Sequence, residues 1–263
     1  MSYLHVDDQK IWYTDTGRGS VPIIFLHGFL MDGTMFDQQV NTLGADFRCI
    51  TVDSRCHGQT EESGHDFTLW DLANDAIAVL DHLGISKATV VGMSQGGMVA
   101  QRVALANPER VSALVLIGTE ARGMTDESRQ LRLRRDAAWA AEGAEGFAPQ
   151  IASVVFGDPD LEAEWIPKWI AWDKARLPQA SRALSFRDSL VDRLAEIACP
   201  VLQIHGREDK AIELTWAMEL RDGLRDVTFI AIDGAHHSPN MTHPIEVNRA
   251  ILNFMAEIAE TKT

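Results

Sequence analysis

The sequence has few cysteines, no N-terminal stretch typical of a secretory signal and no long apolar run. Its three cysteines are odd in number and lack the spacing of metal ligands, which indicates reduced thiols rather than a disulfide framework or a metal centre. The N-terminus has no basic patch followed by an apolar stretch, so a secretory signal is not expected. No run approaches the roughly 18 apolar residues that a membrane helix needs. We therefore expect a soluble, cytoplasmic protein without a membrane span.

Positive charge is also scarce. The chain has 24 Lys and Arg against 38 Asp and Glu, a formal net charge of -14. This balance argues against nucleic acid or an anionic membrane surface as a partner, and solubility explains it simply. The 263 residues are 46% apolar, enough for one large α/β domain or one domain with an insertion. We find no internal repeat and no low-complexity segment.

Outside one long stretch, apolar runs typical of strands alternate with segments of helical periodicity. This alternation predicts an α/β fold with a mostly parallel sheet and helices on both faces. The opening segment is predicted to be a hairpin with strands 3–6 and 11–14 around a turn at 7–10. Further strands are expected at 21–26, 48–52, 88–91, 111–117, 200–206 and 227–232, and helices at 35–43, 69–83, 97–104, 215–224 and from 244 onward.

Residues 120–194 break the alternation. They are mostly helical in character, contain no convincing strand and hold four of the seven tryptophans. We therefore predict a core formed by residues 1–119 and 195–263, with residues 120–194 inserted as a helical cap.

The segment Gly92-Met93-Ser94-Gln95-Gly96 places a serine between two glycines, after an expected strand and before an expected helix. This arrangement is typical of a nucleophile elbow, whereas a plain glycine-rich turn is the alternative interpretation. An elbow serine sits on strained backbone with its hydroxyl exposed, and larger flanking side chains would clash there. Ser94 is therefore the candidate nucleophile.

A serine hydroxyl is a weak nucleophile at neutral pH and needs a positioned base. In the elbow fold, the acid and then the histidine follow the serine along the chain, in loops at the carboxyl ends of strands. Asp209 follows the expected strand ending at Gly206, and His237 follows the strand ending near Asp233. We predict a triad in which His237 takes the proton of Ser94 and Asp209 holds the imidazole in its tautomer.

Both partners have rivals. His236 is adjacent to His237, but spacing along the loop favours His237 and gives His236 a structural role. Glu208 is adjacent to Asp209, and Glu120 could reach the same histidine from a neighbouring strand. For Glu120 the simpler expectation is a solvated start of the insertion.

The developing oxyanion needs two backbone N–H donors. We assign one to Gln95, directly after the nucleophile, and one to Phe29 in the loop after the strand 21–26. The histidine of that loop is expected to brace it, although it is also a candidate pocket residue. The complete set of candidate pocket residues is His27, Trp139, Phe147 and Trp165. The aromatic side chains of the insertion can wall a pocket or form the cap's own core, and core packing is the default for their helical spacing.

Five segments together resemble the landmarks of the α/β-hydrolase superfamily, in the expected order: residues 27–29, 53–58, 92–97, 206–209 and 237–240. The resemblance covers essentially the whole chain outside the insertion. It implies a core sheet of eight strands with a helical cap over the active site. Within the superfamily, the chain is most similar to the 3-oxoadipate enol-lactonase group, in its length, in residues 93–99 and in residues 119–122.

The sequence departs from the superfamily pattern at two positions. Cys56 and His236 stand where glycine is usual, and both lie near the expected site, where they can alter the shape of the pocket. We expect Cys56 to be an inert turn residue. Its neighbours Asp53 and His57 are expected to brace the same turn.

The leading functional interpretation is a serine hydrolase that cleaves a small carboxylic ester or lactone through an acyl-enzyme, with no metal or organic cofactor. One alternative is a cofactor-free perhydrolase or haloperoxidase that uses the same triad. Another is a ligand receptor or signalling protein with slow turnover. A haloalkane dehalogenase or epoxide hydrolase is disfavoured, because those enzymes carry aspartate where this chain has Ser94.

Overall fold

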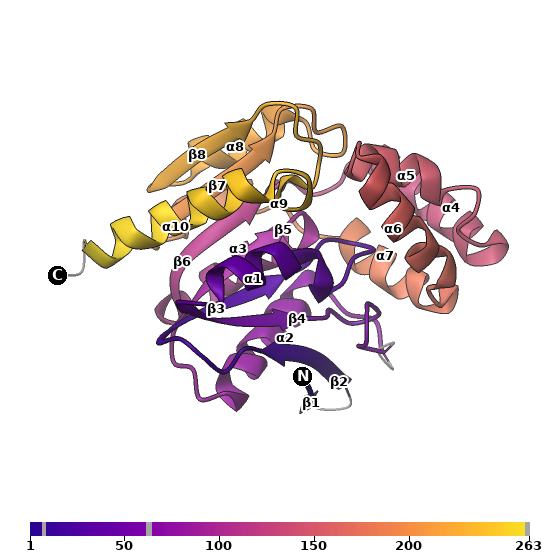
Figure 1. Cartoon of the computed structure of the whole chain (residues 1–263). Helices are drawn as coiled ribbons and strands as arrows, with labels where there is room; N and C mark the ends of the chain where they lie inside the picture. The colour runs from indigo at the N-terminus through magenta and orange to yellow at the C-terminus, as the bar shows by residue number, and fades with distance from the viewer. Residues whose placement is uncertain (7–8, 62–64, 261–263) are drawn as a thin grey trace.

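The computed structural model describes residues 1–6, 9–61 and 65–260, which are organised by one eight-stranded sheet (Figure 1). The strand order is β1-β2-β4-β3-β5-β6-β7-β8. The pairs β1–β2 and β2–β4 are antiparallel, and all other neighbouring strands pair in parallel. This confirms the predicted α/β class. The strands are β1 (Ser2–Val6), β2 (Gln9–Asp15), β3 (Val21–Leu26), β4 (Phe47–Val52), β5 (Ala88–Met93), β6 (Val111–Ile117), β7 (Val201–Gly206) and β8 (Val227–Ile232).

The opening hairpin is present, but its turn is shorter than predicted. Gln9 and Lys10 already belong to β2 and pair with Val6 and His5 of β1. Asp7 and Asp8 lie outside the described residues. The turn residues alone therefore overestimated the length of the connection, because cross-strand pairing extends β2 toward its start.

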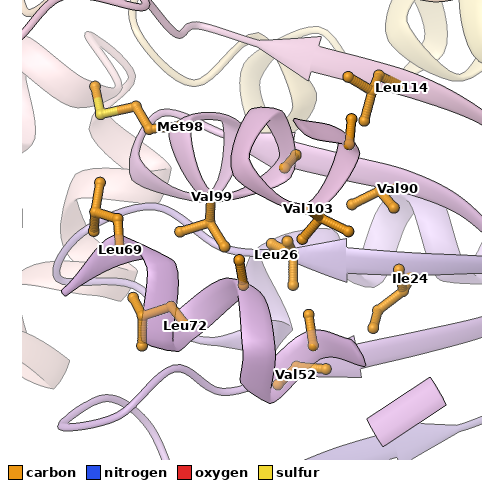
Figure 2. Close-up of a cluster of buried hydrophobic side chains, with 14 of the residues drawn as sticks. Ile24, Leu26, Val52, Leu69, Leu72, Val90, Met98, Val99, Val103 and Leu114 are labelled. Atoms are coloured by element: carbon orange, nitrogen blue, oxygen red, sulfur yellow. The ribbon is translucent and has the colours of Figure 1, made fainter. Parts of the chain in front are cut away.

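The central strands are buried on both faces, and successive side chains point into two different hydrophobic cores, one on each face of the sheet. In β3, Ile24 and Leu26 join the core under α2 (Leu69–His82) and α3 (Gln95–Ala106). Figure 2 shows this core, in which side chains of both helices meet those of β3, β5 and β6. Ile23 and Phe25 point the other way, into the core under α1 (Asp37–Leu43) and α10 (Pro244–Glu260).

The helices of the core begin and end near the predicted residues. Thr68 caps α2 in a capping box with Asp71, so local chemistry fixes the start of this helix. The sequence did not predict the four-residue helix α9, which is too short to show a period. The remaining helical elements of the core are η1 (Gly33–Phe36), η2 (Pro108–Arg110), α8 (Leu214–Gly223) and α9 (Pro239–Thr242), and η4 (Val191–Glu196) crosses the expected end of the insertion.

Between β6 and β7 the chain forms helices, and none of the residues from 118 to 200, all described, belongs to a strand. Figure 1 shows these helices gathered in a group beside the sheet. They are α4 (Asp126–Glu142), α5 (Ala148–Val155), α6 (Pro159–Ala171), η3 (Lys174–Arg176) and α7 (Leu177–Ser185). The division into core and cap at residues 120 and 194 stays a prediction.

Over the described ranges, no helix is both long and apolar enough to cross a membrane.

The order of the strands also points to where a ligand would bind. β3 lies between β4 and β5, so the chain leaves β3 to one side and later returns on the other. In open α/β sheets, the crevice outside the carboxyl ends of the strands at such a point is the usual ligand site. The loops after β3 and β5, which carry Phe29 and Ser94, meet there.

Gly96 allows α3 to approach β3 directly. A Cβ at this position would overlap the backbone carbonyl of Leu26. We predict that Gly96→Ala lowers the free energy of unfolding by about 1–3 kcal/mol or more, because backbone cannot move aside as a side chain can. The measurement is the urea midpoint of unfolding.

The matched control is Gly146→Ala. A Cβ there has no described heavy atom within 4 Å, and the glycine lies in an exposed turn. This control should change the stability by no more than about 0.5 kcal/mol. Equal midpoints for the two variants would contradict the close approach of α3 to β3.

Candidate active site

Ser94 forms the whole connection between β5 and α3. Its backbone has φ 51° and ψ -114°, a conformation that costs a non-glycine residue about 1–3 kcal/mol. Two hydrogen bonds hold it there. The Ser94 N–H donates to the carbonyl of Ile117 at 2.8 Å, and the Thr119 hydroxyl donates to the Ser94 carbonyl at 2.7 Å. The predicted strand–turn–helix is therefore present, and β6 fixes its strained residue.

The structure brings the three side chains of the predicted triad together. His237 Nε2 lies 2.9 Å from Ser94 Oγ, and His237 Nδ1 lies 2.8 Å from Asp209 Oδ2. A carboxylate only accepts hydrogen bonds, so Nδ1 carries the proton and the lone pair of Nε2 faces the serine hydroxyl. This is the tautomer that a general base needs.

Asp209 is buried and held from both sides. Its Oδ1 accepts the N–H groups of Ala211 and Ile212 at 2.8 and 2.9 Å, leaving Oδ2 for His237. Burial raises the pKa of this carboxyl, but His237 and the backbone N–H groups outweigh burial and bring the pKa below its usual value. Asp209 is therefore ionised and able to stabilise a protonated His237.

A second histidine supports the loop of Asp209, and the sequence analysis missed it. His205, at the end of β7, is fully buried. Its Nε2 lies 3.0 Å from the Ile212 carbonyl and 3.5 Å from Asp209 Oδ2. Burial lowers the pKa of His205, so the ring is neutral and Nε2–H donates to the carbonyl. The sequence does not reveal this contact, because it depends on how the loop between β7 and α8 turns back toward His205.

The loop after β3 approaches the nucleophile closely. A Cβ at Gly28 would lie 3.6 Å from the Cβ of Ser94. The N–H of neighbouring Phe29 makes no backbone hydrogen bond within the described residues. Gln95 is the first residue of α3, so its N–H has no carbonyl one turn earlier to bind. Both N–H groups are thus free to donate, and their role as an oxyanion hole stays a prediction.

The comparison with known families agrees with this geometry. The model of the alpha/beta hydrolase fold family matches residues 21–244. The chain belongs to this family. Among curated relatives, the putative non-heme bromoperoxidase BpoC of Mycobacterium tuberculosis is 30% identical. The alignment has a length of 267 and covers 94% of this chain and 97% of the relative.

Two further similarities bear on the family resemblance. The 3-oxoadipate enol-lactonase 1 of Acinetobacter baylyi is 28% identical over 245 residues, which cover 90% of this chain and 89% of the relative. Among solved structures, an esterase from Thermogutta terrifontis is similar with a TM-score of 0.89 and 24% identity, over 95% of this chain and 94% of that one. The similarity to the esterase supports the hydrolase fold.

Two rivals of the predicted triad residues, Glu208 and His236, have other surroundings. Glu208 is exposed. The His236 ring packs against Gly157 of the insertion, where a Cβ would overlap it, in line with a structural role. Neither residue has a described hydrogen bond to Ser94 or His237.

The expectation of a solvated Glu120 is wrong. Glu120 is 4% exposed, and Arg187 Nη2 donates to its Oε1 at 2.8 Å. Arg187, which follows α7, also donates from Nε to the carbonyl of Arg122. Burial raises the pKa of Glu120, and Arg187 opposes that rise only in part. Glu120 is therefore committed to an ion pair that joins the end of β6 to the end of the helical insertion.

The turn after β4 uses its residues as braces. Cys56 has φ 68°, which explains why glycine suits this position in the family, and its Sγ lies 3.4 Å from Gln179 Oε1 of α7. Asp53 accepts two backbone N–H groups of its surroundings at 2.8 Å. Burial lowers the pKa of His57 to about 3, so this ring is neutral, and it stacks on Trp172. These contacts fix the turn against the insertion.

His27 braces two loops. It is fully buried, its Nδ1 lies 2.7 Å from the Gly28 carbonyl, and its Nε2 accepts the Ser54 N–H at 2.9 Å. Both ring nitrogens are thus occupied in joining the loops after β3 and β4. These contacts provide the expected bracing role, and a pocket role for His27 stays a prediction.

The other pocket candidates belong to the core of the insertion. Trp139 is buried and stacks on Phe147 with ring centroids 6.3 Å apart. Trp165 is also buried, yet it borders a cavity of about 400 Å³ between α6 and the turn at His57. A pocket role for Trp165 thus stays a prediction, while Trp139 packs as core aromatics do.

Among the residues that the structure describes, no group of three or more His, Cys, Asp or Glu side chains is placed to hold a metal ion.

We predict that Arg187→Met lowers the free energy of unfolding by about 3–5 kcal/mol at pH 8, because it leaves a buried carboxylate unpaired. The loss should be smaller at pH 5. The pKa of Glu120 is raised in wild type, and loss of the Arg187 cation raises it further, so the penalty relative to wild type grows as pH rises from the wild-type pKa through that of the variant, and then levels off. Urea unfolding at both pH values, each against wild type, measures this.

The control is Arg193→Met, which removes a comparable ion pair with Glu196 on the surface. Solvent screens that pair, so the stability should change little at either pH. A pH-independent loss in Arg187→Met would contradict the assigned role of Glu120.

Proposed function

We propose that this α/β hydrolase is a serine hydrolase that cleaves small carboxylic esters or lactones through an acyl-enzyme on Ser94. The observation that carries the proposal is the continuous hydrogen-bond chain of 2.9 and 2.8 Å from Ser94 Oγ through His237 to Asp209. The last member of this hydrogen-bond series, Asp209, is a carboxylate with a lowered pKa, as a charge-stabilising residue requires.

In the first half of the reaction, Ser94 Oγ attacks the substrate carbonyl carbon while its proton passes to His237 Nε2. The N–H groups of Phe29 and Gln95 receive the negative charge that develops on the carbonyl oxygen. The tetrahedral intermediate then collapses, the bond to the leaving oxygen breaks, and His237 returns the proton to that oxygen. An ester thus releases an alcohol, whereas in a lactone the new hydroxyl stays attached to the acyl group.

In the second half, His237 takes a proton from water, which attacks the acyl carbon. Collapse of the second intermediate releases the carboxylic acid and restores the Ser94 hydroxyl. Throughout, Asp209 stays ionised and balances the positive charge that forms on the imidazole ring. These steps use only the chain's own residues and water.

We propose that the helical insertion, residues 120–194, acts as a cap on a core formed by residues 1–119 and 195–263. It packs its aromatic side chains into the same core that lies under β3 and β5, so its position depends on the strands that carry the site. A small-molecule substrate is proposed because the relatives include a protein named as a 3-oxoadipate enol-lactonase.

The test is hydrolysis of p-nitrophenyl acetate. Ser94→Ala and His237→Ala should each lower kcat by at least about 10³-fold, since nucleophile and base act as a unit. His236→Ala, one residue away, should retain most of the activity. Substantial activity in Ser94→Ala would remove the central assignment, and a larger loss in His236→Ala than in His237→Ala would move the base by one residue.

A second candidate is perhydrolysis, favoured by the 30% identity to a protein named as a putative non-heme bromoperoxidase. Here hydrogen peroxide replaces water in the attack on the acyl-enzyme, and a peroxycarboxylic acid leaves. That peracid oxidises bromide and is itself reduced to the carboxylic acid. Bromination of monochlorodimedone with acetate and peroxide, present in wild type at a rate comparable to ester hydrolysis and absent in Ser94→Ala, would favour this candidate. Ester hydrolysis without bromination would exclude it.

A further inference from the structure

Helix α4 places a cation directly above the loop of the candidate oxyanion site. The guanidinium carbon of Arg132 lies 4.4 Å from the centroid of the Phe29 ring. Phe29 also carries one of the two proposed oxyanion N–H groups, and its loop approaches Ser94 through Gly28. In the proposed reaction the substrate carbonyl lies at this loop, which makes Arg132 a candidate for contact with the acyl group.

The charge of Arg132 is poorly matched within the protein. The nearest carboxylate is Asp136, 3.6 Å from Arg132 Nε, which is too far for a good hydrogen bond. Asp136 already binds Arg135 at 2.7 Å through Oδ1 and the Ser181 hydroxyl through Oδ2. Within the described residues Arg132 donates no hydrogen bond, and its Nε is buried without an acceptor.

The neighbouring arginines differ from Arg132 in this respect. Four of them form a close ion pair with a carboxylate: Arg102 with Asp188 at 2.5 Å, Arg129 with Asp126 at 2.6 Å, Arg135 with Asp136 at 2.7 Å and Arg187 with Glu120 at 2.8 Å. Arg134, also on α4, forms no ion pair with a described residue, but its side chain is exposed to solvent. Arg132 thus combines a side chain that is only 18% exposed with the lack of a close ion pair.

The surroundings also make the weakly paired charge of Arg132 unfavourable. Burial, together with Arg135 and Arg187, lowers the pKa of Arg132 to about 9, against the opposing effect of Asp136. The group is still a cation at neutral pH. An anion bound at its accessible Nη atoms would offset this cost, and a carboxylate matches the forked geometry of a guanidinium.

We propose that Arg132 binds a carboxylate carried by the acyl part of the substrate, and so selects half-esters of dicarboxylic acids and lactones that bear a carboxylate. This inference rests on the proposed function, because it extends the acyl site next to Ser94. Arg132 makes no bond to the reacting atoms in this scheme. It is a specificity-determining residue that orients the acyl chain from the cap side.

The experiment compares mono-p-nitrophenyl glutarate with its methyl ester, which has the same skeleton and leaving group but no charge. Succinate and adipate half-esters vary the reach to Arg132. Wild type should prefer the half-ester in kcat/KM for at least one chain length. Arg132→Gln should reduce the ratio of half-ester to diester by about 10- to 100-fold, the range expected for hydrogen bonds to a charged group. The change should appear chiefly in KM.

Arg132→Lys, which keeps the charge but not the fork, should retain part of the preference. Arg134→Gln is the matched control on the same helix, since its side chain is exposed and forms no ion pair with a described residue. It should leave the ratio unchanged. An unchanged ratio in Arg132→Gln, or an equal fall in Arg134→Gln, would overturn the assignment.

One further measurement needs no variant and separates the two proposals. Free glutarate should inhibit hydrolysis of the neutral diester by wild type, and dimethyl glutarate should not. If wild type hydrolyses the diester but neither prefers the half-ester nor responds to glutarate, the carboxylate site is wrong and the proposed function stands. If wild type hydrolyses neither ester, the proposed function fails. The site is then judged by calorimetric titration with glutarate, where saturation in wild type and its loss in Arg132→Gln support it, and equal titrations overturn it.

Discussion

A single residue, Ser94, joins β5 to α3, and its left-handed backbone (φ 51°) determines how closely the surrounding elements can pack. The sharp turn brings the first turn of α3 against the end of β3, which leaves no room for a Cβ at Gly92 or Gly96. The same packing directs the N-terminus of α3, with its free N–H groups, toward the space above the sheet. The strain is balanced by hydrogen bonds from β6 through Ile117 and Thr119.

Two buried carboxylates near this turn differ in environment, and the difference separates their roles. Asp209 is surrounded by donors, so its pKa falls despite burial. Glu120 has one close cation, and burial still raises its pKa. Both carboxyl groups interact electrostatically with His237, but only Asp209 is hydrogen-bonded to the ring and can orient it. Glu120 instead holds Arg187, and with it the end of the insertion, against β6.

Local patterns predicted the strands and the elbow, because each depends on neighbours in sequence, whereas the order of the candidate triad residues was inferred from the elbow fold. The capping box at Thr68 and the glycines around Ser94 are signals of this kind. The ion pair of Glu120 with Arg187 joins residues 67 positions apart, and no periodicity reveals such a contact. The position of Arg132 over Phe29 likewise depends on how α4 packs on the β3 loop. These contacts depend on tertiary packing. Glu120 was expected to be solvated because nothing in the sequence indicates that Arg187 lies beside it.

The helical insertion is hydrogen-bonded to three of the loops that surround the candidate site. Trp169 donates to the Leu30 carbonyl at 2.7 Å, Arg176 to the Gly58 carbonyl at 3.2 Å, and the Ser238 N–H to the Val155 carbonyl at 3.1 Å. These bonds tie α5, α6 and η3 to the loops after β3, β4 and β8. A helix that shifts to admit a larger acyl group must therefore break or carry along bonds to the loops that position Phe29 and His237. In the proposed hydrolase, substrate selection and bond cleavage would therefore be physically coupled, since the same hydrogen bonds restrain the insertion and the loops of the candidate triad.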